Sequence, residues 1–396
     1  MVFDKNIYRK ILSNAFSIPV QVKYWDGSKE NYGDGEPVVK IIFNEEIPVT
    51  NFMHEPTLRL AEAYMHENLD IEGSIQKLVA SAFATKESFL TNKHLIKYLP
   101  KASHSEKASE EDIHRHYDIG NDFYEKWLDP TMTYSCAYFE SPDDTLEQAQ
   151  HNKIGHILRK LNPVGGKTFL DIGSGWGAMI IAAAKFYNLK TTGITLSQEQ
   201  FDYTKEQIKK EGLEDQVDVW LMDYREVPKN VNFDYVVSVG MFEHVGKHNL
   251  GLYFQKIKDL LVTDGLALIH GITGQHEGLG VDPFLAKYIF PGGYIPNVAE
   301  NLTHIMDAKL QLDDLEPMRR HYQKTLECWI SNYHKVFKET SEKYGRDFAR
   351  MWDMYLQASA GSFEAGNIDI MQFLLSNGRS NQTLPMTRSY MYKSEK

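Results

Sequence analysis

The chain has 396 residues, of which 42% are hydrophobic and 24% charged, as expected for a globular protein of two or three domains. Its net charge of −11 argues against broad nucleic-acid binding, so no nucleic-acid partner is predicted. The two cysteines, Cys136 and Cys328, indicate a reducing cytoplasm rather than a disulfide framework. No apolar run approaches the roughly 20 residues that span a bilayer, which predicts a soluble chain.

The first 100 residues predict a small α+β domain. Two short apolar runs flank turn-rich glycine and aspartate residues, and two amphipathic stretches follow them. The expected strands and helices are, in chain order, Val20–Tyr24, Val38–Phe43, Thr57–Glu67 and Ile75–Ala84.

Residues 101–112 are polar and lack large apolar side chains, which is typical of a linker. From residue 113 to 396, apolar strands alternate with helical stretches, and this order predicts a mostly parallel sheet covered on both faces. The polar tail after Leu384 is expected to fray. The seven predicted strands are Thr168–Ile172, Thr191–Ile194, Val217–Met222, Phe233–Val239, Gly265–His270, Leu310–Leu315 and Ile370–Leu375.

A segment dense in aromatic and polar residues precedes the first of these strands. It runs from His114 to Tyr124 and continues over Met132–Phe139. One interpretation is a helical lid whose rings pack in the core. The other is that Tyr134 and Tyr138, which flank Cys136, direct their rings at a positive centre.

The most informative motif is the turn after the first strand, Asp171–Gly177, in which an acid leads into glycines spaced Gly-x-Gly-x-Gly. Gly173 and Gly175 allow a ligand to approach the backbone closely. The helix predicted over Ala178–Tyr187 offers unpaired N–H groups at its start. With the strand that follows, this is a βαβ unit suited to an adenosine-type cofactor.

The second strand ends in Thr195 and Gln200, where a nicotinamide-dependent enzyme usually carries an acid. An alternative is that Ser197 and Gln200 form a capping box for the next helix. Both interpretations are compatible, since a cap fixes the loop that holds a ligand.

The third strand ends in Asp223 and Tyr224, a carboxylate for an adenine amine and a ring to stack on it. Asp223 is equally well explained as the cap of the following helix, and the sequence leaves both explanations open.

The chemistry is predicted at the ends of the fourth and fifth strands. Glu243 follows a buried strand beside Phe242, where burial would raise the carboxyl pKa and suit proton transfer. His270 ends the neighbouring strand, and a Glu and a His on adjacent strand ends favour a functional site over a structural one. No spacing of His, Cys, Asp or Glu suggests a metal.

These motifs together resemble the cyclopropane-fatty-acyl-phospholipid synthases and the related mycolic-acid cyclopropane synthases. The resemblance covers residues 114 to about 375, and the N-terminal domain is similar to that of the bacterial phospholipid enzymes. The segments that carry it are His116–Tyr124, Tyr134–Phe139, Asp171–Gly177, Thr195–Gln200, Phe242–Gly246 and Tyr288–Gly293.

The resemblance implies a Rossmann-like class I methyltransferase fold that uses S-adenosylmethionine on a cis-unsaturated acyl chain of a membrane phospholipid. The alkene would attack the sulfonium methyl, and bound bicarbonate would deprotonate the resulting carbocation before the ring closes. The bicarbonate would be held by Cys136, Glu243, His270, Tyr322 and the backbone of Ile272. The implied cofactor contacts are Tyr134, Ser135, Asp171, Gly173, Gly175, Thr195, Gln200, Asp223 and Tyr224.

The chain departs from the resemblance at Ser359, where many relatives carry a Cys, and this departure argues against a thiol nucleophile there. The sequence leaves two other functions open. An ordinary methyltransferase acting on a small amine would need no anion site, and a non-catalytic sensor of S-adenosylmethionine would not need the strand-end Glu and His.

Membrane contact is expected to be peripheral and reversible, at the inner face of the membrane. Residues 86–107 interleave five lysines with aromatic and aliphatic side chains, giving a local charge of +3 against two glutamates. A packed helix followed by a solvated linker explains the same residues. The apolar loop Tyr288–Pro296 is a possible lid, and the relatives suggest a homodimer, which would strengthen adsorption.

Overall fold

The computed structural model describes residues 5–48, 55–85, 119–275, 281–378 and 384–392, and these form two compact units. Unit 1 contains residues 1–102, 280–291 and 326–368, and unit 2 contains residues 103–279, 292–325 and 369–396. The predicted linker at 101–112 and the basic segment at 86–107 lie outside the described residues. Unit 1 therefore takes in two segments from the later part of the chain.

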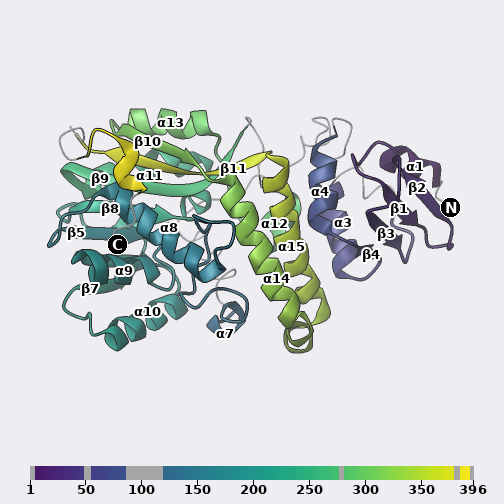
Figure 1. The fold of residues 1–396 in the computed structure, drawn as a ribbon, viewed down its shortest axis with the longest axis horizontal. Coiled ribbons are helices and arrows are strands. Elements are labelled where there is room, and N and C mark those ends of the chain that lie inside the picture. Colours follow the sequence, from purple (N-terminus) through teal and green to yellow (C-terminus); the bar gives the residue numbers. More distant parts are fainter. Residues whose placement is uncertain (1–4, 49–54, 86–118, 276–280, 379–383, 393–396) are drawn as a thin grey trace. The chain divides into compact units, whose positions relative to one another are not determined.

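Unit 2 is built on a sheet of seven strands in the order β10-β11-β9-β8-β5-β6-β7 (Figure 1). The five strands from β9 to β7 pair in parallel, whereas β10 and β11 pair antiparallel. All seven predicted strands are present, which confirms the predicted α/β class. Their bounds are β5 Thr168–Ile172, β6 Lys190–Thr195, β7 Val217–Leu221, β8 Phe233–Val239, β9 Leu261–Gly274, β10 Gln311–Pro317 and β11 Ile368–Ser376.

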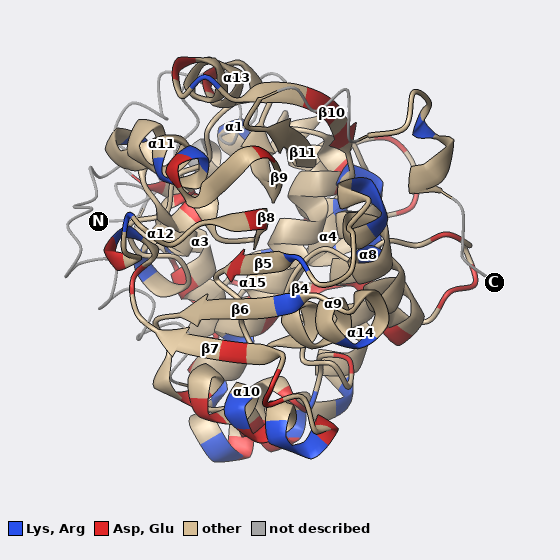
Figure 2. Cartoon of the chain, turned by 90° about the vertical axis from the view of Figure 1, so that its left-hand side faces the viewer, with Lys and Arg blue, Asp and Glu red and all other residues tan. Residues whose placement is uncertain are grey.

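Helices cover both faces of this sheet. The core on one face joins α8 (Leu146–Leu161) and α9 (Ala178–Tyr187) to β5, with α10 (Gln198–Glu211) adding Ile208. The core on the other face contains α11 (Leu250–Leu260) and α13 (Val298–Asp307). Acidic and basic side chains are mixed over α10, as expected for a solvated helix face (Figure 2).

The prediction that the tail frays after Leu384 is wrong for residues 384–392. The chain forms a short 3₁₀ helix over Arg388–Met391, and the Met391 side chain is buried. The Met391 carbonyl accepts a hydrogen bond from Arg159 Nε at 3.1 Å. Polar composition concealed this anchor, because the apolar contacts come from a few separated residues, Leu384, Tyr390 and Met391.

Unit 1 contains a four-stranded sheet in the order β2-β1-β3-β4. The strands β2 and β4 were not predicted. Lys-Glu-Asn-Tyr shows no alternation of apolar and polar residues, and Leu-Asp-Ile-Glu alternates over only four residues. The helix α15 packs on α3 and α4 within the same unit. The elements are β1 Val20–Lys23, β2 Lys29–Tyr32, β3 Val39–Phe43, β4 Leu69–Glu72, α1 Lys5–Leu12, α3 Pro56–Met65, α4 Ile75–Phe83, α12 Pro283–Tyr288 and α15 Arg346–Ala365.

Polar contacts fix α15 against the N-terminal segments of unit 1. The buried Arg350 guanidinium donates to the Leu69 carbonyl at 3.0 Å and to Asp70 Oδ1 at 2.6 Å. The Tyr64 hydroxyl donates to an Asp353 carboxylate oxygen at 2.8 Å. Two helices from distant parts of the chain are thus held together by charge-assisted bonds as well as by apolar packing.

Candidate active site

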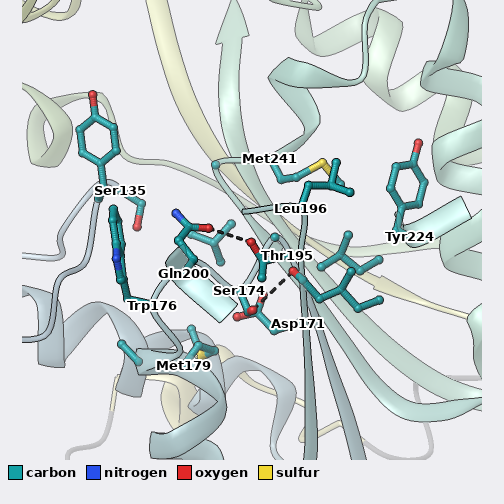
Figure 3. A pocket seen from close by; sticks show the side chains of 18 of the residues that line it. Ser135, Asp171, Ser174, Trp176, Met179, Thr195, Leu196, Gln200, Tyr224 and Met241 are labelled. Atoms are coloured by element: carbon teal, nitrogen blue, oxygen red, sulfur yellow. Dashed lines mark hydrogen bonds between the residues drawn. The ribbon is translucent and has the colours of Figure 1, made fainter. Parts of the chain in front are cut away.

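A pocket opens in unit 2 where β5, β6, β7 and β8 end, the edge at which open α/β sheets bind ligands (Figure 3). Every residue implied for the cofactor by resemblance lines it. These residues are Tyr134, Ser135, Asp171, Gly173, Gly175, Thr195, Gln200, Asp223 and Tyr224.

The glycine-rich turn brings the backbone to the pocket wall. Gly173 has a φ of +80°, and a Cβ there would lie 2.9 Å from Met241 Cγ, so no other residue fits without movement. The amides of Gly173 and Ser174 both donate to the Ile194 carbonyl at 2.9 Å. The turn is therefore fixed to β6 before it reaches the start of α9.

At the end of β6, the segment Thr195–Gln200 both lines the pocket and caps the next helix. Thr195 Oγ1 donates to Gln200 Oε1 at 2.8 Å, and both side chains line the pocket (Figure 3). Ser197 caps α10, since its hydroxyl accepts from the Gln200 amide at 3.3 Å. The predicted capping box is only half formed, because the Gln200 side chain bonds Thr195 instead.

At the end of β7, Asp223 is a cap as well as a pocket residue. Its carboxylate accepts from the Arg225 amide at 2.7 Å and from the Arg225 guanidinium at 2.6 and 2.8 Å. The Tyr224 ring is buried edge-on against Tyr253. A ligand amine at Asp223 would therefore share the carboxylate with Arg225.

A buried lysine that no sequence motif indicated also lines this pocket. Lys153 of α8 is 2% exposed, and its Nζ donates to Ser135 Oγ at 2.8 Å. Burial lowers the pKa of Lys153 to about 8, although Cys136, Asp129 and Asp171 act in the opposite direction. The available signal was a lysine on the apolar face of α8, between Ala149 and Ile157.

Asp171 lies in the same pocket and is 3% exposed. Burial raises the pKa of the Asp171 carboxyl to about 7, and the positive charge of Lys153 opposes this rise. Its Oδ1 has no hydrogen-bond partner within the described part of the chain. The pocket thus holds a carboxylate oxygen available to a cationic or N–H group of a ligand.

Glu243 is fixed by the next strand. It lies in a 3₁₀ turn, Phe242–His244, directly after β8, and its Oε1 accepts from the Ile272 amide of β9 at 2.6 Å. Burial raises the Glu243 pKa to about 7, while the Ile272 N–H partly opposes this. Its Oε2 is buried and has no protein partner among the described residues. The predicted rise in pKa is confirmed.

Gly271 allows this arrangement. A Cβ at Gly271 would lie 1.9 Å from the Phe242 ring, so only glycine lets that ring pack against β9. Phe242 is 1% exposed and immediately precedes Glu243. The close approach of ring and strand therefore places the carboxylate within reach of the Ile272 amide.

His270 lies in β9, opposite Val239 of β8. The prediction that it ends its strand is wrong, because β9 continues to Gly274. Burial lowers the His270 pKa well below the usual value, so the imidazole is neutral. Gln372 Nε2 is 3.2 Å from His270 Nδ1, and donation from the amide assigns the ring proton to Nε2. That N–H is buried without a partner in the described ranges.

Cys136 and Tyr322 are the other two side chains that the resemblance implies for bicarbonate. Cys136 is fully buried, and burial raises the pKa of its thiol, so it is a neutral thiol. Thr325 Oγ1 accepts from the Ala137 amide at 3.0 Å, which places this part of α14 (Arg319–Tyr344) beside Cys136. Tyr322 lies one turn earlier in that helix. None of Cys136, Glu243, His270, Ile272 and Tyr322 lines the glycine-rich pocket itself.

The interpretation of Tyr138 as a ring facing a positive centre is wrong. Tyr138 stacks between the His156 and His321 rings, with centroids 4.2 and 4.6 Å away. Tyr134 lines the pocket and packs against Trp127. Ser359 belongs to α15 and lines a cavity of unit 1.

We expect the buried Glu243 carboxyl to make stability depend on pH. Because its folded pKa is raised to about 7 from 4.5, its contribution is fully present below pH 4.5 and is lost as the pH rises through 7. Wild type should lose up to about 3 kcal/mol relative to Glu243→Gln between pH 4.5 and 8. Urea unfolding of both proteins across this range measures the difference, and parallel curves would contradict it.

The order of the sheet, the glycine-rich turn after β5 and the pocket at the strand ends define a class I S-adenosylmethionine-dependent methyltransferase fold. The fold of coclaurine N-methyltransferase matches 81% of the chain at a TM-score of 0.66 and 19% identity, and so supports the fold alone. No helix among the described residues is both long and apolar enough to cross a membrane.

Comparisons with known proteins identify the family. Residues 104–373 match the family described as mycolic acid cyclopropane synthetase, and residues 7–94 match a domain of unknown function. The chain therefore belongs to the cyclopropane synthase family and is an enzyme of the S-adenosylmethionine-dependent methyltransferase class.

Three relatives illustrate this membership. A probable fatty acid methyltransferase of Pseudomonas putida is 38% identical over 387 residues, which are 96% of this chain and 98% of that protein. The cyclopropane-fatty-acyl-phospholipid synthase of Escherichia coli K12 is 39% identical over 266 residues, 67% of this chain and 68% of that protein. The structure of mycolic acid cyclopropane synthase CmaA1 with SAH and CTAB matches 67% of this chain and 98% of its own at a TM-score of 0.64 and 31% identity.

Proposed function

We propose that this enzyme adds a methylene group from S-adenosylmethionine across a cis double bond of an unsaturated phospholipid acyl chain, forming a cyclopropane ring. The observation that carries the proposal is a pair of buried groups, one directly after β8 and one on the neighbouring strand β9. The first is a carboxyl with its pKa raised to about 7, and the second is a neutral imidazole. The similarity to the Escherichia coli synthase supports the choice of substrate.

The glycine-rich pocket suits the cofactor by its chemistry. The unpartnered Asp171 Oδ1 fits the ammonium of an amino acid, and Gly173 leaves no Cβ between the backbone and a ligand. Tyr134, Ser135, Gly175, Thr195, Gln200, Asp223 and Tyr224 would complete its contacts. When bound, S-adenosylmethionine supplies an electrophilic methyl carbon on a positively charged sulfur.

Lys153 would bind the carboxylate of the cofactor's amino acid group. The Lys153 ammonium donates a hydrogen bond to the Ser135 hydroxyl oxygen, so a buried positive charge lies next to this hydroxyl. A carboxylate next to Ser135 would be stabilised by this charge in a low-dielectric site. Lys153 and Asp171 together would recognise a zwitterion.

The second group of residues fits a small oxyanion such as bicarbonate. His270 presents an unpartnered N–H, and Glu243, whose pKa is near 7, can donate a proton or accept one at Oε2. The neutral Cys136 thiol adds a weak donor and brings no competing charge. The Ile272 amide serves this site by holding Glu243 in place. Bound bicarbonate would supply a proton acceptor close to the positive charge that develops on the lipid.

Membrane adsorption, dimerisation and a cytoplasmic location at the inner face of the membrane are further parts of the proposal. They rest on the resemblance and on the alternation of lysines with apolar residues over 86–107. Adsorption would be reversible, as suits an enzyme that must leave one lipid for the next.

Mass spectrometry of lipids from cells that express the chain tests the proposed reaction. We expect unsaturated phospholipids to gain one methylene and lose the double bond. The matched control is the same cells expressing Glu243→Gln. A methyl-branched product, methylation of a small amine, or unchanged lipids would refute ring formation.

A further inference from the structure

A second cavity lies entirely within unit 1, apart from the glycine-rich pocket of unit 2. It has a volume of about 800 Å³ and is lined by residues of α1, β3, β4, α3, α4, α12 and α15. Its walls are mainly aliphatic and aromatic, with Ile41, Leu60, Leu78, Phe284 and Met354 as examples. Natural ligand sites for molecules of moderate size have volumes of roughly 300–1,000 Å³.

The few polar groups in the walls do not require a polar ligand inside. The Asp282 carboxylate caps α12 by accepting from the Phe284 amide at 2.9 Å, and the Thr57 hydroxyl also bonds it. The Tyr8 hydroxyl donates to the Ile47 carbonyl. No lining side chain among the described residues carries a buried polar atom without a partner. An apolar occupant therefore matches the interior.

One basic residue of the lining is unpaired. On α1, Lys5 pairs with Asp26 and Arg9 pairs with Glu30. Lys10 lines the same cavity and is exposed, and it forms no ion pair with any residue in the described ranges. An apolar interior with an unpaired positive charge at the exposed side of the cavity suits a ligand that has an apolar chain and an anionic group.

We propose that this cavity binds one fatty acyl chain of an anionic phospholipid, with the phosphate beside Lys10. The inference rests on the proposed function and extends it. An acyl chain outside the bilayer is stabilised by apolar surroundings, which the aliphatic and aromatic walls of this cavity provide. The proposed lipid site also gives a role to residues 7–94, which match a domain of unknown function.

The occupancy of the cavity can be tested with the full-length protein and dioctanoylphosphatidylglycerol below its micelle concentration. Ala61→Phe and Ala82→Phe place a ring into the cavity from α3 and α4. Native mass spectrometry should count one bound lipid fewer per chain for both variants than for wild type. S-adenosylhomocysteine affinity, measured by calorimetry, should stay within twofold and reports that unit 2 is folded. An unchanged lipid count would overturn the proposal.

The anionic part of the proposal has its own test. Lys10→Glu should weaken lipid binding at least fivefold, whereas Lys29→Glu, an equal charge change on exposed β2 away from the cavity, should not. Both residues are exposed, so both variants are expected to fold. Equal binding by the two variants, or equal wild-type affinity for dioctanoylphosphatidylcholine, would overturn it. Lipid binding without any cyclopropane product would refute only the proposed reaction.

Discussion

Replacing Glu243 by Gln is expected to lower the rate of ring formation at saturating substrate by about 10²- to 10⁴-fold. The amide keeps the size of the side chain and can still accept from Ile272, but it neither takes nor gives a proton. The assay is turnover on vesicles of unsaturated phospholipid. Because Glu243 does not line the glycine-rich pocket, S-adenosylhomocysteine affinity should change less than twofold.

The Glu243→Asp variant separates charge from position. It keeps a carboxylate but withdraws it by one methylene from the Ile272 amide, which it now meets at 2.6 Å. We expect a rate between those of wild type and Glu243→Gln. If cofactor affinity collapses in both variants while turnover at saturation survives, Glu243 belongs to cofactor binding and the role assigned to it is wrong.

Replacing Lys153 by Met is expected to weaken S-adenosylhomocysteine binding by about 10- to 100-fold, since a charge-assisted hydrogen-bond network is lost. Methylthioadenosine carries the nucleoside and sulfur without the amino acid. Its affinity should therefore stay nearly constant, because we propose that the ammonium bonded to Ser135 binds the amino acid group, which this ligand lacks. Calorimetric titration with both ligands measures the difference.

The matched control is Lys160→Met on the same helix. Lys160 is also fully buried, but it pairs with Glu316 at 2.6 Å and does not line the pocket. This variant should lower the melting temperature and change the two affinities alike. If Lys153→Met also weakens both ligands equally, the lysine stabilises the fold and does not recognise a zwitterion.

Much of unit 2 was predictable because its signals are local. The strands β5 and β8 begin and end where the apolar runs do, and α9 follows its glycines directly. Except for Tyr134 and Ser135, which precede β5, the predicted cofactor residues lie at or shortly after strand ends, and parallel topology brings such ends to one edge. Glu243 and His270 were predicted by the same rule, although β9 continues beyond His270.

The features that could not be predicted from the sequence depend on contacts between residues far apart in the chain. Lys153 is a pocket residue only because α8 packs beside Asp171, and lysines on helices are usually exposed. Tyr138 stacks on His321, 183 positions later, so its neighbours in sequence were misleading. The edge strand β2 has a burial pattern without fully buried positions, and so shows no apolar alternation.

The mixed origin of unit 1 has a consequence for how this enzyme tolerates shortening. Three buried side chains of α15, Arg350, Asp353 and Gln357, bond to groups on residues 64–75. Deleting the first hundred residues would remove these hydrogen-bond partners and expose to water the face of α15 that packs on α3 and α4. The N-terminal portion therefore covers a helix encoded some 280 codons later, and a shortened chain would need other residues to cover that helix.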